Sequence, residues 1–185
     1  MKTGKINQFL TRGLTRKFYR GAFPADIYFN FKAPYCVVMN CDSHNGPGSH
    51  WIAWFVTKST IYFFDSMGRS PRDPSLPKEF GLFIKNKKKT VVYNHKVVEG
   101  IFSRTCGEFC IFVLWHLCKG NKWKDILNRF DNNETIESTL ANDKLVQNFV
   151  KKLKTSKIKN LASPHHFQLS QFCVAHWFYR NCLAT

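Results

Sequence analysis

The stretch "SRTCGEFCIFVLWHLCKG", residues 103–120, places a cysteine and a glycine directly before a long apolar run. His116 is the one polar residue in that run, and its length suits a helix buried on most sides better than a strand. Gly120 follows the run and predicts the C-terminal end of the helix. The sequence therefore predicts a buried central helix that begins near Cys106.

Cys106 differs from the other cysteines of this helix. Cys110 and Cys118 lie inside the apolar run, where a free cysteine acts as a small hydrophobic residue. Cys106 lies at the expected first turn, where unpaired backbone N–H groups and the positive end of the helix dipole favour a thiolate. A thiolate is the nucleophilic form of cysteine, so this position suits covalent catalysis if a base stands nearby.

Length and composition predict one packed domain that spans residues 1–185, since 44% of the residues are hydrophobic and 16% are aromatic. No apolar run approaches the roughly 20 residues of a membrane-spanning helix, and the first residues lack the apolar core of a signal peptide. Seven cysteines without regular spacing favour free thiols over a disulfide framework. We therefore expect a monomer in a reducing intracellular compartment, away from membranes.

The chain carries 28 Lys and Arg residues against 12 Asp and Glu residues, a formal net charge of +16. Such a charge predicts attraction to polyanions, and a solvated basic surface without a partner is the alternative. The basic residues are dispersed and form no base-reading motif, so contact with DNA would be electrostatic and independent of sequence. The candidate DNA-contacting residues are Lys85, Lys87, Lys88, Lys89, Lys151 and Lys152.

Apolar patterns and turn signals predict strands at residues 35–41, 50–56, 61–65 and 90–98. The second and third of these form a hairpin across "TKST". The strand at 50–56 has no polar face, so both faces of the sheet should be covered. Helical spacing predicts a short helix before the break at "GAFPAD", with Ile6, Leu10 and Leu14 on one face, and further helices at 77–86, 122–130 and 143–153. The last two should pack on the outside of the sheet.

Seven histidines are candidates for the base that would activate Cys106, and a catalytic triad needs a third group to orient the base. His50 opens one strand of the predicted hairpin and Asp65 closes the other, so residue 50 should lie opposite residues 65–67. One ring nitrogen would then bind the Asp65 carboxylate while the other faces the thiol. The remaining histidines lack a carboxylate at matched register: His44, His95, His116, His165, His166 and His176.

Each of these residues also has a structural interpretation. A histidine at a strand start is commonly a surface residue, and an aspartate after a strand is commonly a turn former. The order His, Asp, Cys on a strand, a strand and a helix start is more specific than any one of them.

The segments "GSHWIAWFVTKSTIYFFDSMGRSP" and "VVEGIFSRTCGEFCIFVLWHLCKG" resemble the adenovirus-type, adenain-like cysteine endopeptidases, above all the versions in mobile elements such as Polintons and adintoviruses. The resemblance is strongest over residues 34–120, and the core match covers about 21–155, which leaves the tail at 164–185 unassigned. It implies an α+β fold with a mixed central sheet flanked by helices and the nucleophile at the start of the central helix. It assigns the nucleophile to Cys106, the general base to His50 and the orienting acid to Asp65.

One departure from the family concerns the oxyanion hole. These proteases have a glutamine seven residues before the cysteine that supplies a side-chain N–H, and this chain has Glu99 there. An ionised glutamate only accepts hydrogen bonds. Three interpretations stay open: Glu99 is protonated and donates through its O–H, or the backbone N–H of Cys106 and its neighbours suffice, or the enzyme is impaired, since losing one donor costs ~10²–10³ in kcat. We expect a working but slower enzyme.

The resemblance implies a thiol protease for virion maturation that cleaves viral or mobile-element precursor proteins near small residues such as glycine. The Cys106 thiolate would attack the peptide carbonyl, with His50 as acid and then as base. Trp51 and Gly107 should line the substrate cleft, although Trp51 is equally consistent with a core aromatic residue. Location in the host nucleus or the virion, and stimulation by non-specific DNA and by a short activating peptide, are further implications of the resemblance.

Two other functions stay open, and a metal site is not expected. A ubiquitin-like-protein isopeptidase shares the order of the triad, but Thr105 and the seven-residue gap favour the viral type. A non-catalytic nucleic-acid-binding or capsid-binding protein on the same fold stays open because of Glu99 and the basic charge. No cofactor or metal is expected, because Cys36, Cys41 and His44 have irregular spacing and no C-x-x-C pair exists.

Overall fold

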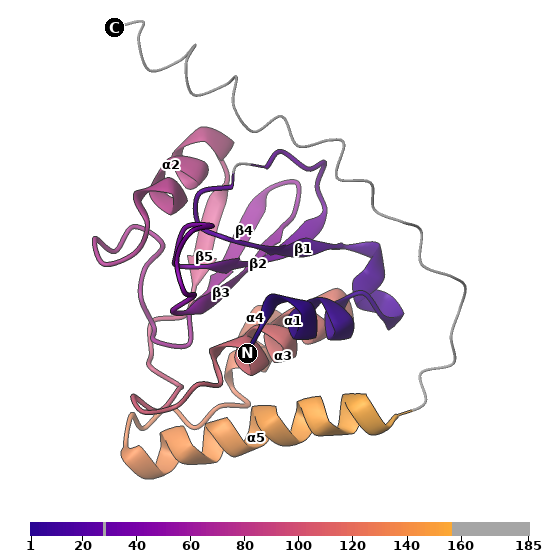
Figure 1. Ribbon diagram of the computed structural model, residues 1–185, viewed down its shortest axis with the longest axis vertical. Coiled ribbons are helices and arrows are strands. Elements are labelled where there is room, and N and C mark those ends of the chain that lie inside the picture. Colours follow the sequence, from indigo (N-terminus) through magenta and orange to yellow (C-terminus); the bar gives the residue numbers. More distant parts are fainter. Residues whose placement is uncertain (28, 157–185) are drawn as a thin grey trace, which may run out of the picture.

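The computed structural model describes residues 1–27 and 29–156, and the unassigned tail lies outside the described residues. It shows a five-stranded mixed sheet with helices on both faces, which confirms the predicted α+β class (Figure 1). The elements in chain order are α1 (Thr3–Leu10), the 3-10 helix η1 (Gly13–Lys17), β1 (Tyr19–Phe23), β2 (Tyr35–Asn40), β3 (Trp51–Val56), β4 (Thr60–Phe64), α2 (Lys78–Lys87), β5 (Thr90–Tyr93), α3 (Cys106–Cys118), α4 (Trp123–Leu127) and α5 (Ile136–Thr155).

The strands lie side by side in the order β1-β2-β3-β4-β5. The inner pairs β2–β3 and β3–β4 are antiparallel, while β1–β2 and β4–β5 are parallel. In the predicted hairpin, Ala53 lies opposite Phe64 and Val56 lies opposite Ile61, so the hairpin is confirmed. This register fixes which residues meet where β3 begins and β4 ends.

Both faces of the sheet are covered, as the apolar strand at 50–56 predicts. Because side chains alternate along a strand, Ala53 and Phe55 join the cluster beneath α1, α3 and α5, while Ile52 and Trp54 join the cluster beneath α2. All residues of β2 and β3 are buried. Burying a large apolar side chain contributes about 1.5–3 kcal/mol, so these two inner strands anchor the fold.

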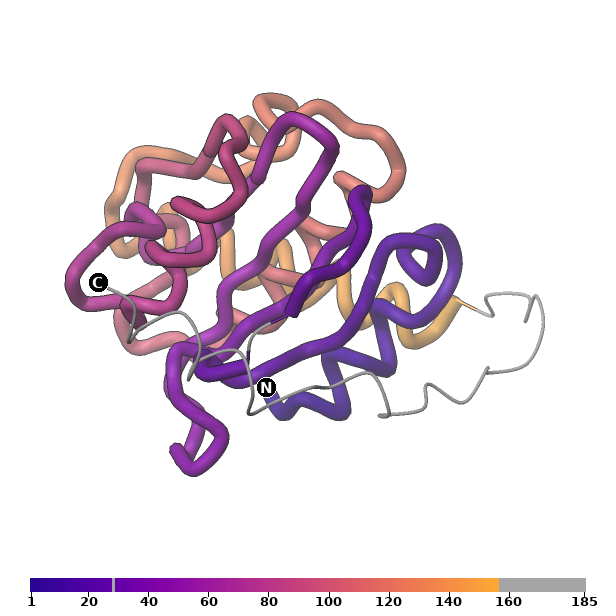
Figure 2. Tube along the Cα trace, turned by 90° about the horizontal axis from the view of Figure 1, so that it is seen from above, coloured from indigo at the N-terminus to yellow at the C-terminus, as the bar shows by residue number. Residues whose placement is uncertain are grey.

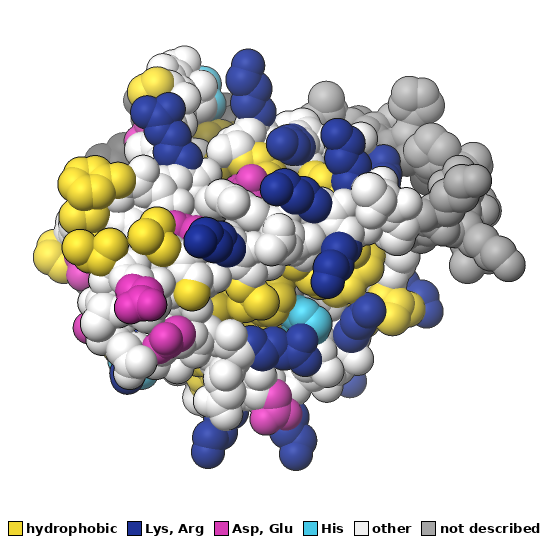
Figure 3. Space-filling view, turned by 90° about the horizontal axis from the view of Figure 1, so that it is seen from below, with side chains coloured by type: hydrophobic (Ala, Val, Ile, Leu, Met, Phe, Trp, Pro, Cys, Tyr) yellow, Lys and Arg dark blue, Asp and Glu magenta, His cyan; other side chains and the backbone are white. Residues whose placement is uncertain are grey.

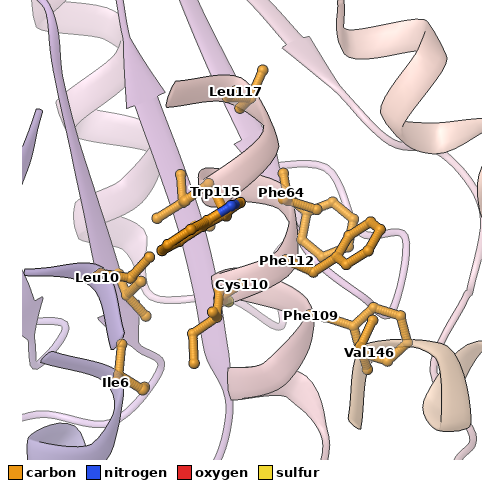
Figure 4. Packing of buried hydrophobic residues seen from close by; sticks show 14 of the residues in the cluster. Ile6, Leu10, Phe64, Phe109, Cys110, Phe112, Trp115, Leu117 and Val146 are labelled. Atoms are coloured by element: carbon orange, nitrogen blue, oxygen red, sulfur yellow. The ribbon is translucent and has the colours of Figure 1, made fainter. Parts of the chain in front are cut away.

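Helix α3 is the predicted central helix. All its residues except Glu108 are buried. Figure 4 shows Ile6 and Leu10 of α1 on one side of α3, and Phe64 of β4 and Val146 of α5 on the other. The nucleophile candidate therefore sits on an element that is held by packing from several directions.

Two expectations at the N-terminal end of the chain are wrong. No helix passes through "GAFPAD", as predicted, but the sequence predicts no strand before residue 35, and Tyr19–Phe23 form β1, a strand that pairs with β2 in parallel. Gly21 has a φ of +140°, and a strand with such a glycine lacks the local signature of β structure. Leu14 is 48% exposed in η1, so it does not continue the buried face of α1.

The end of β5 and the start of α5 also differ from the predictions. Strand β5 ends at Tyr93, because the Asn94 side chain turns inward to bond the backbone of Asp65. Helix α5 begins at Ile136 rather than at residue 143, since Thr135 and Ser138 form a capping box. It packs against α3 instead of directly on the sheet, as Figure 1 shows. None of the helices in the described residues is long and apolar enough to cross a membrane.

Candidate active site

His50 and Asp65 meet at the edge of the sheet where β3 begins and β4 ends. The carbonyl of His50 accepts a hydrogen bond from the Cys41 N–H at 2.8 Å, which extends the β2–β3 ladder by one residue. The His50 side chain is thereby held beside the end of β4. Its Nε2 lies 2.7 Å from Oδ1 of Asp65.

The Asp65 side chain is fully buried and surrounded by donors. Burial alone would raise the pKa of Asp65, but hydrogen bonds from His50, Arg69 and the Met67 N–H lower it below its usual value. Nε of Arg69 donates to Oδ2 of Asp65 at 2.7 Å, and the Met67 N–H donates to Oδ1 at 2.9 Å. Asp65 is therefore a carboxylate at neutral pH, with its position fixed by three partners.

His50 carries a shifted pKa for a related reason. Burial alone would lower the pKa of His50, but hydrogen bonding to Asp65 and Cys106 raises it to about 9. Since Nε2 is engaged by Asp65, Nδ1 is the ring nitrogen left for the thiol. The ring is therefore positively charged at neutral pH, with Nδ1 directed toward Cys106.

Cys106 is the first residue of α3 and is 7% exposed. The residue before it fixes the helix start in two ways. The Thr105 N–H donates to Oε1 of Glu99 at 2.8 Å, and the Thr105 hydroxyl donates to Oδ1 of Asp143 at 2.6 Å. The start of α3 is therefore tied both to the loop before it and to α5.

Glu99 is buried and lies against the same site. Besides the Thr105 N–H, it accepts a hydrogen bond from Oγ of Ser66, which lies 2.5 Å from its Oε2. In both contacts a Glu99 oxygen is the acceptor. One ligand atom each of His50, Glu99 and Cys106 lie within 4.8 Å of one another. Within residues 1–27 and 29–156, this is the group that could hold a metal ion, and Cys36, Cys41 and His44 form no such group.

The turn after β4 links Asp65 to Glu99 through a close backbone approach. Gly68 has a φ of +70°, and a Cβ there would lie 2.7 Å from the carbonyl carbon of Lys96. The carbonyl of Ser66 accepts the N–H of Val98 at 2.9 Å. A residue with a side chain at position 68 would push these two segments apart.

Trp51 and Gly107, the expected cleft residues, both contact Met1. The Trp51 indole N–H donates to the Met1 carbonyl at 2.9 Å, and a Cβ on Gly107 would lie 2.9 Å from Cβ of Met1. Trp51 is 8% exposed and packs in the core, yet it lines a groove of about 510 Å³ between residues 1–4 and the loop after β2. Figure 2 shows this loop projecting from the body near the N-terminus.

A second groove, of about 880 Å³, includes Glu99 and Thr105 in its wall. Its wall also contains Ile101, Phe102 and Ile136, which are 74%, 94% and 82% exposed. Figure 3 views the molecule from the α5 side and shows hydrophobic side chains gathered at one end, with Lys and Arg side chains spread over the rest.

The lysines predicted to contact DNA lie in two separate layers. Lys85, Lys87, Lys88 and Lys89 lie at the end of α2 and in the turn after it, whereas Lys151 and Lys152 lie near the end of α5. Because α2 and α5 are on opposite sides of the sheet (Figure 1), the structure does not bring the two groups together.

Two of these lysines also have partners within the chain. Nζ of Lys87 donates to Oδ1 of Asn30 at 2.7 Å, and Nζ of Lys89 donates to the Thr57 carbonyl at 2.9 Å. DNA contact through these lysines stays a prediction.

Four residues that support the site were missed in the sequence. Ser66 directly follows Asp65, and Arg69 lies four residues after it. Closeness to Asp65 along the chain could therefore have identified both. Asn94 donates to the Asp65 carbonyl at 2.6 Å. Asp143 binds Thr105 from a distant helix. No local pattern marks these last two, because their contacts depend on tertiary packing.

Comparisons with known proteins give a distant relative. No protein-family model matches the sequence. The chain is 30% identical over 91 residues to the protease of Porcine adenovirus A serotype 3, and the match covers 43% of this chain and 45% of that protein. The chain thus spans less than half the length of this relative. This distant similarity agrees with an adenovirus-type cysteine protease and does not bear on the mobile-element versions.

Among solved structures, the chain is similar to the central domain of the uncharacterized Lpg1148 protein from Legionella pneumophila. The TM-score is 0.46 and the identity is 12%, over 83% of this chain and 97% of that chain. At this level the likeness carries no statement about function.

Proposed function

We propose that this protein is an adenain-like cysteine endopeptidase with Cys106 as nucleophile, His50 as acid and base, and Asp65 as the orienting acid. The proposal is carried by one observation: the His50 imidazole is bonded to a buried carboxylate at 2.7 Å and faces the first residue of a buried helix. The distant similarity to a porcine adenovirus protease supports the same class.

The proposed reaction begins from a Cys106 thiolate beside a charged His50 ring, whose pKa of about 9 favours this pair at neutral pH. The sulfur attacks the peptide carbonyl, and the imidazolium gives its proton to the leaving amine. The neutral imidazole then takes a proton from water, which attacks the thioester and releases the acid. Asp65 keeps the ring oriented with Nδ1 toward sulfur throughout.

The proposed oxyanion hole rests on backbone amides. The Cys106 N–H lies in the first turn of α3, where N–H groups have no partner within the helix. The Glu99 carboxylate accepts from Thr105 and Ser66 and would repel the developing oxyanion. We therefore propose a working but slow enzyme.

The substrates, partners and location follow from the same resemblance and are proposals. Viral or mobile-element precursor proteins, cut near small residues such as glycine, are the proposed substrates. The charge of +16 supports stimulation by non-specific DNA, with location in the host nucleus or the virion. An activating peptide is proposed from the resemblance alone.

Labelling tests the proposed nucleophile. A peptide vinyl sulfone that ends in glycine should modify Cys106 faster than Cys41, as measured by mass spectrometry of the digested chain. Cys41 is the matched comparison, because burial raises its pKa to about 12 although it lies near the same site. Equal labelling of both cysteines, together with no cleavage of glycine-containing peptides in the presence or absence of DNA, would favour the binding-protein alternative.

Glu99→Gln tests the oxyanion hole. We expect kcat for a glycine-containing peptide to rise by about 10-fold or more, since a single oxyanion donor is worth ~10²–10³. The side-chain oxygen of the glutamine can still accept the hydrogen bond from the Thr105 N–H. One amide N–H can donate to the Ser66 hydroxyl, and the second is then available for the oxyanion. Glu108→Gln is the matched control, because it removes a negative charge from the same groove without placing a donor at position 99. An unchanged or lower kcat for Glu99→Gln would contradict the assignment.

A further inference from the structure

The candidate catalytic centre contains the three kinds of side chain that bind zinc in proteins: a thiol, an imidazole and a carboxylate. One ligand atom of each of Cys106, His50 and Glu99 lies within 4.8 Å of the other two. Cys, His and Asp or Glu are the ligands of zinc, and catalytic sites commonly use three of them and leave a fourth position open. We propose that these three residues form a binding site for Zn²⁺ that reversibly blocks the nucleophile.

The three ligand atoms would fit the tetrahedral coordination of zinc if they moved slightly closer together. Zinc lies about 2.3 Å from sulfur and about 2.0–2.2 Å from nitrogen or oxygen, so neighbouring ligand atoms lie about 3.3–3.7 Å apart. Because the present separations are within 4.8 Å, movements of about 1 Å at side-chain torsions bring the ligands into place.

The groups around the ligands are those that metal sites use to orient them. A ligating histidine donates its other ring N–H to a carboxylate, and Nε2 of His50 is 2.7 Å from Asp65. A ligating carboxylate is itself hydrogen-bonded, and the two oxygens of Glu99 accept from Thr105 and Ser66. Each carboxylate oxygen has two acceptor positions, so one remains for the ion. The 3.3 Å contact of the Thr105 hydroxyl to Glu99 does not take it, since that proton goes to Asp143 at 2.6 Å.

The charges also balance around a divalent cation. The Cys106 thiolate and the Glu99 carboxylate supply two negative charges, and both residues are buried. The remaining carboxylate, Asp65, is paired with Arg69 at 2.7 Å. The complex of Zn²⁺ with these three ligands is therefore neutral. Glu99 matters here, because an amide at position 99 would supply neither the charge nor a strong zinc ligand.

Binding would consume the nucleophile. In the resting pair proposed above the proton is on His50, so binding of Zn²⁺ releases the Nδ1 proton to solvent and frees that nitrogen to bind the ion. The sulfur lone pair that would otherwise attack a carbonyl carbon forms the S–Zn bond. Removal of the ion by a chelator restores the thiol, so the block is reversible. The binding step stands on the geometry alone, whereas the inhibition rests on the proposed protease function.

The experiment is a metal titration of the reduced full-length chain. Co²⁺ bound to a thiolate gives a charge-transfer absorption in the near ultraviolet, and Zn²⁺ then displaces Co²⁺ because it binds more tightly to the same ligands. We expect the absorption in the unchanged chain and its loss in Cys106→Ala and Cys106→Ser. Glu99→Gln and His50→Ala should keep the absorption and weaken Zn²⁺ binding at least about 10-fold.

Two controls separate this site from other thiols and imidazoles. Cys41→Ser and His44→Ala change a thiol and an imidazole that do not belong to the group, and both variants should bind Zn²⁺ as the unchanged chain does. The last residues of the chain carry further His and Cys, and any ion that they bind would persist in Cys106→Ala. Binding that is unaffected by both Cys106 and Glu99 substitutions would overturn the proposal.

A cleavage assay with Zn²⁺, with and without a chelator, distinguishes the two proposals. Metal binding that depends on Cys106 in a chain that cleaves nothing would support the site and overturn the protease function. Cleavage that depends on Cys106 without binding of Zn²⁺ or Co²⁺ at that residue would do the reverse. Cleavage that Zn²⁺ blocks and the chelator restores, with the block weakened about 10-fold or more in Glu99→Gln, supports both.

Discussion

Cys106→Ser should abolish peptide cleavage while the fold remains intact. We expect kcat/KM to fall by roughly 10⁴-fold or more, because a triad without its nucleophile keeps only the contribution of binding and of the oxyanion hole. A serine hydroxyl at this position is not ionised by the His50 ring as a thiol is. The measurement is steady-state cleavage of a glycine-containing peptide, with circular dichroism to check the fold.

Cys41→Ser is the matched control for this change. Cys41 is partly exposed and directly follows β2, so serine is tolerated there and activity should stay within about a factor of 3. Cys110 would be a poor control, since it is fully buried in the core of α3 and a hydroxyl there would lack a partner. Cleavage by Cys106→Ser at the rate of the unchanged chain would remove this residue from the mechanism.

Asp65→Asn should lower kcat/KM about 10²–10⁴-fold and change its pH dependence. In the unchanged chain the acid form of His50, with a pKa of about 9, persists through neutral pH, so activity should fall only above about pH 9. Hydrogen bonding to Asp65 is a main cause of that raised pKa, and its loss moves the pKa down. The basic limb of the variant should therefore lie nearer pH 7. An asparagine N–H would also favour the wrong tautomer of the ring.

The control for Asp65→Asn is a second His–Asp pair on the surface. Nδ1 of His44 lies 2.5 Å from Oδ2 of Asp26, and the His44 side chain is 62% exposed. Asp26→Asn removes a carboxylate from this exposed pair and should leave kcat/KM and its pH profile unchanged. A profile for Asp65→Asn that matches the unchanged chain from pH 5 to pH 10 would show that Asp65 does not set the protonation of His50.

The contacts that could be predicted are those governed by short-range rules. In an antiparallel hairpin the register is fixed by the turn, so counting along the strands was enough to place His50 beside Asp65. The start of α3 at Cys106 followed from the point where polar sequence gives way to an apolar run. These rules apply within about 20 residues and need no knowledge of the rest of the fold.

The contacts that were missed cross between distant segments. The tie between Thr105 and Asp143 exists because α5 packs on α3, and no local pattern encodes that packing. Strand β1 was missed because it forms by parallel pairing at the sheet edge and contains Gly21. The contact between Glu99 and Ser66 likewise depends on the turn after β4, which places Ser66 next to Glu99.

The close backbone approach at Gly68 limits how the residues of this centre can change. The turn that presents Asp65 and the segment that presents Glu99 touch there with room for a hydrogen atom and no more. The acid that orients the imidazole and the acid beside the thiol are thus mechanically coupled rather than separate modules. A lineage that altered one of these loops would displace the other, so the proposed hydrolysis and the proposed affinity for Zn²⁺ would change together.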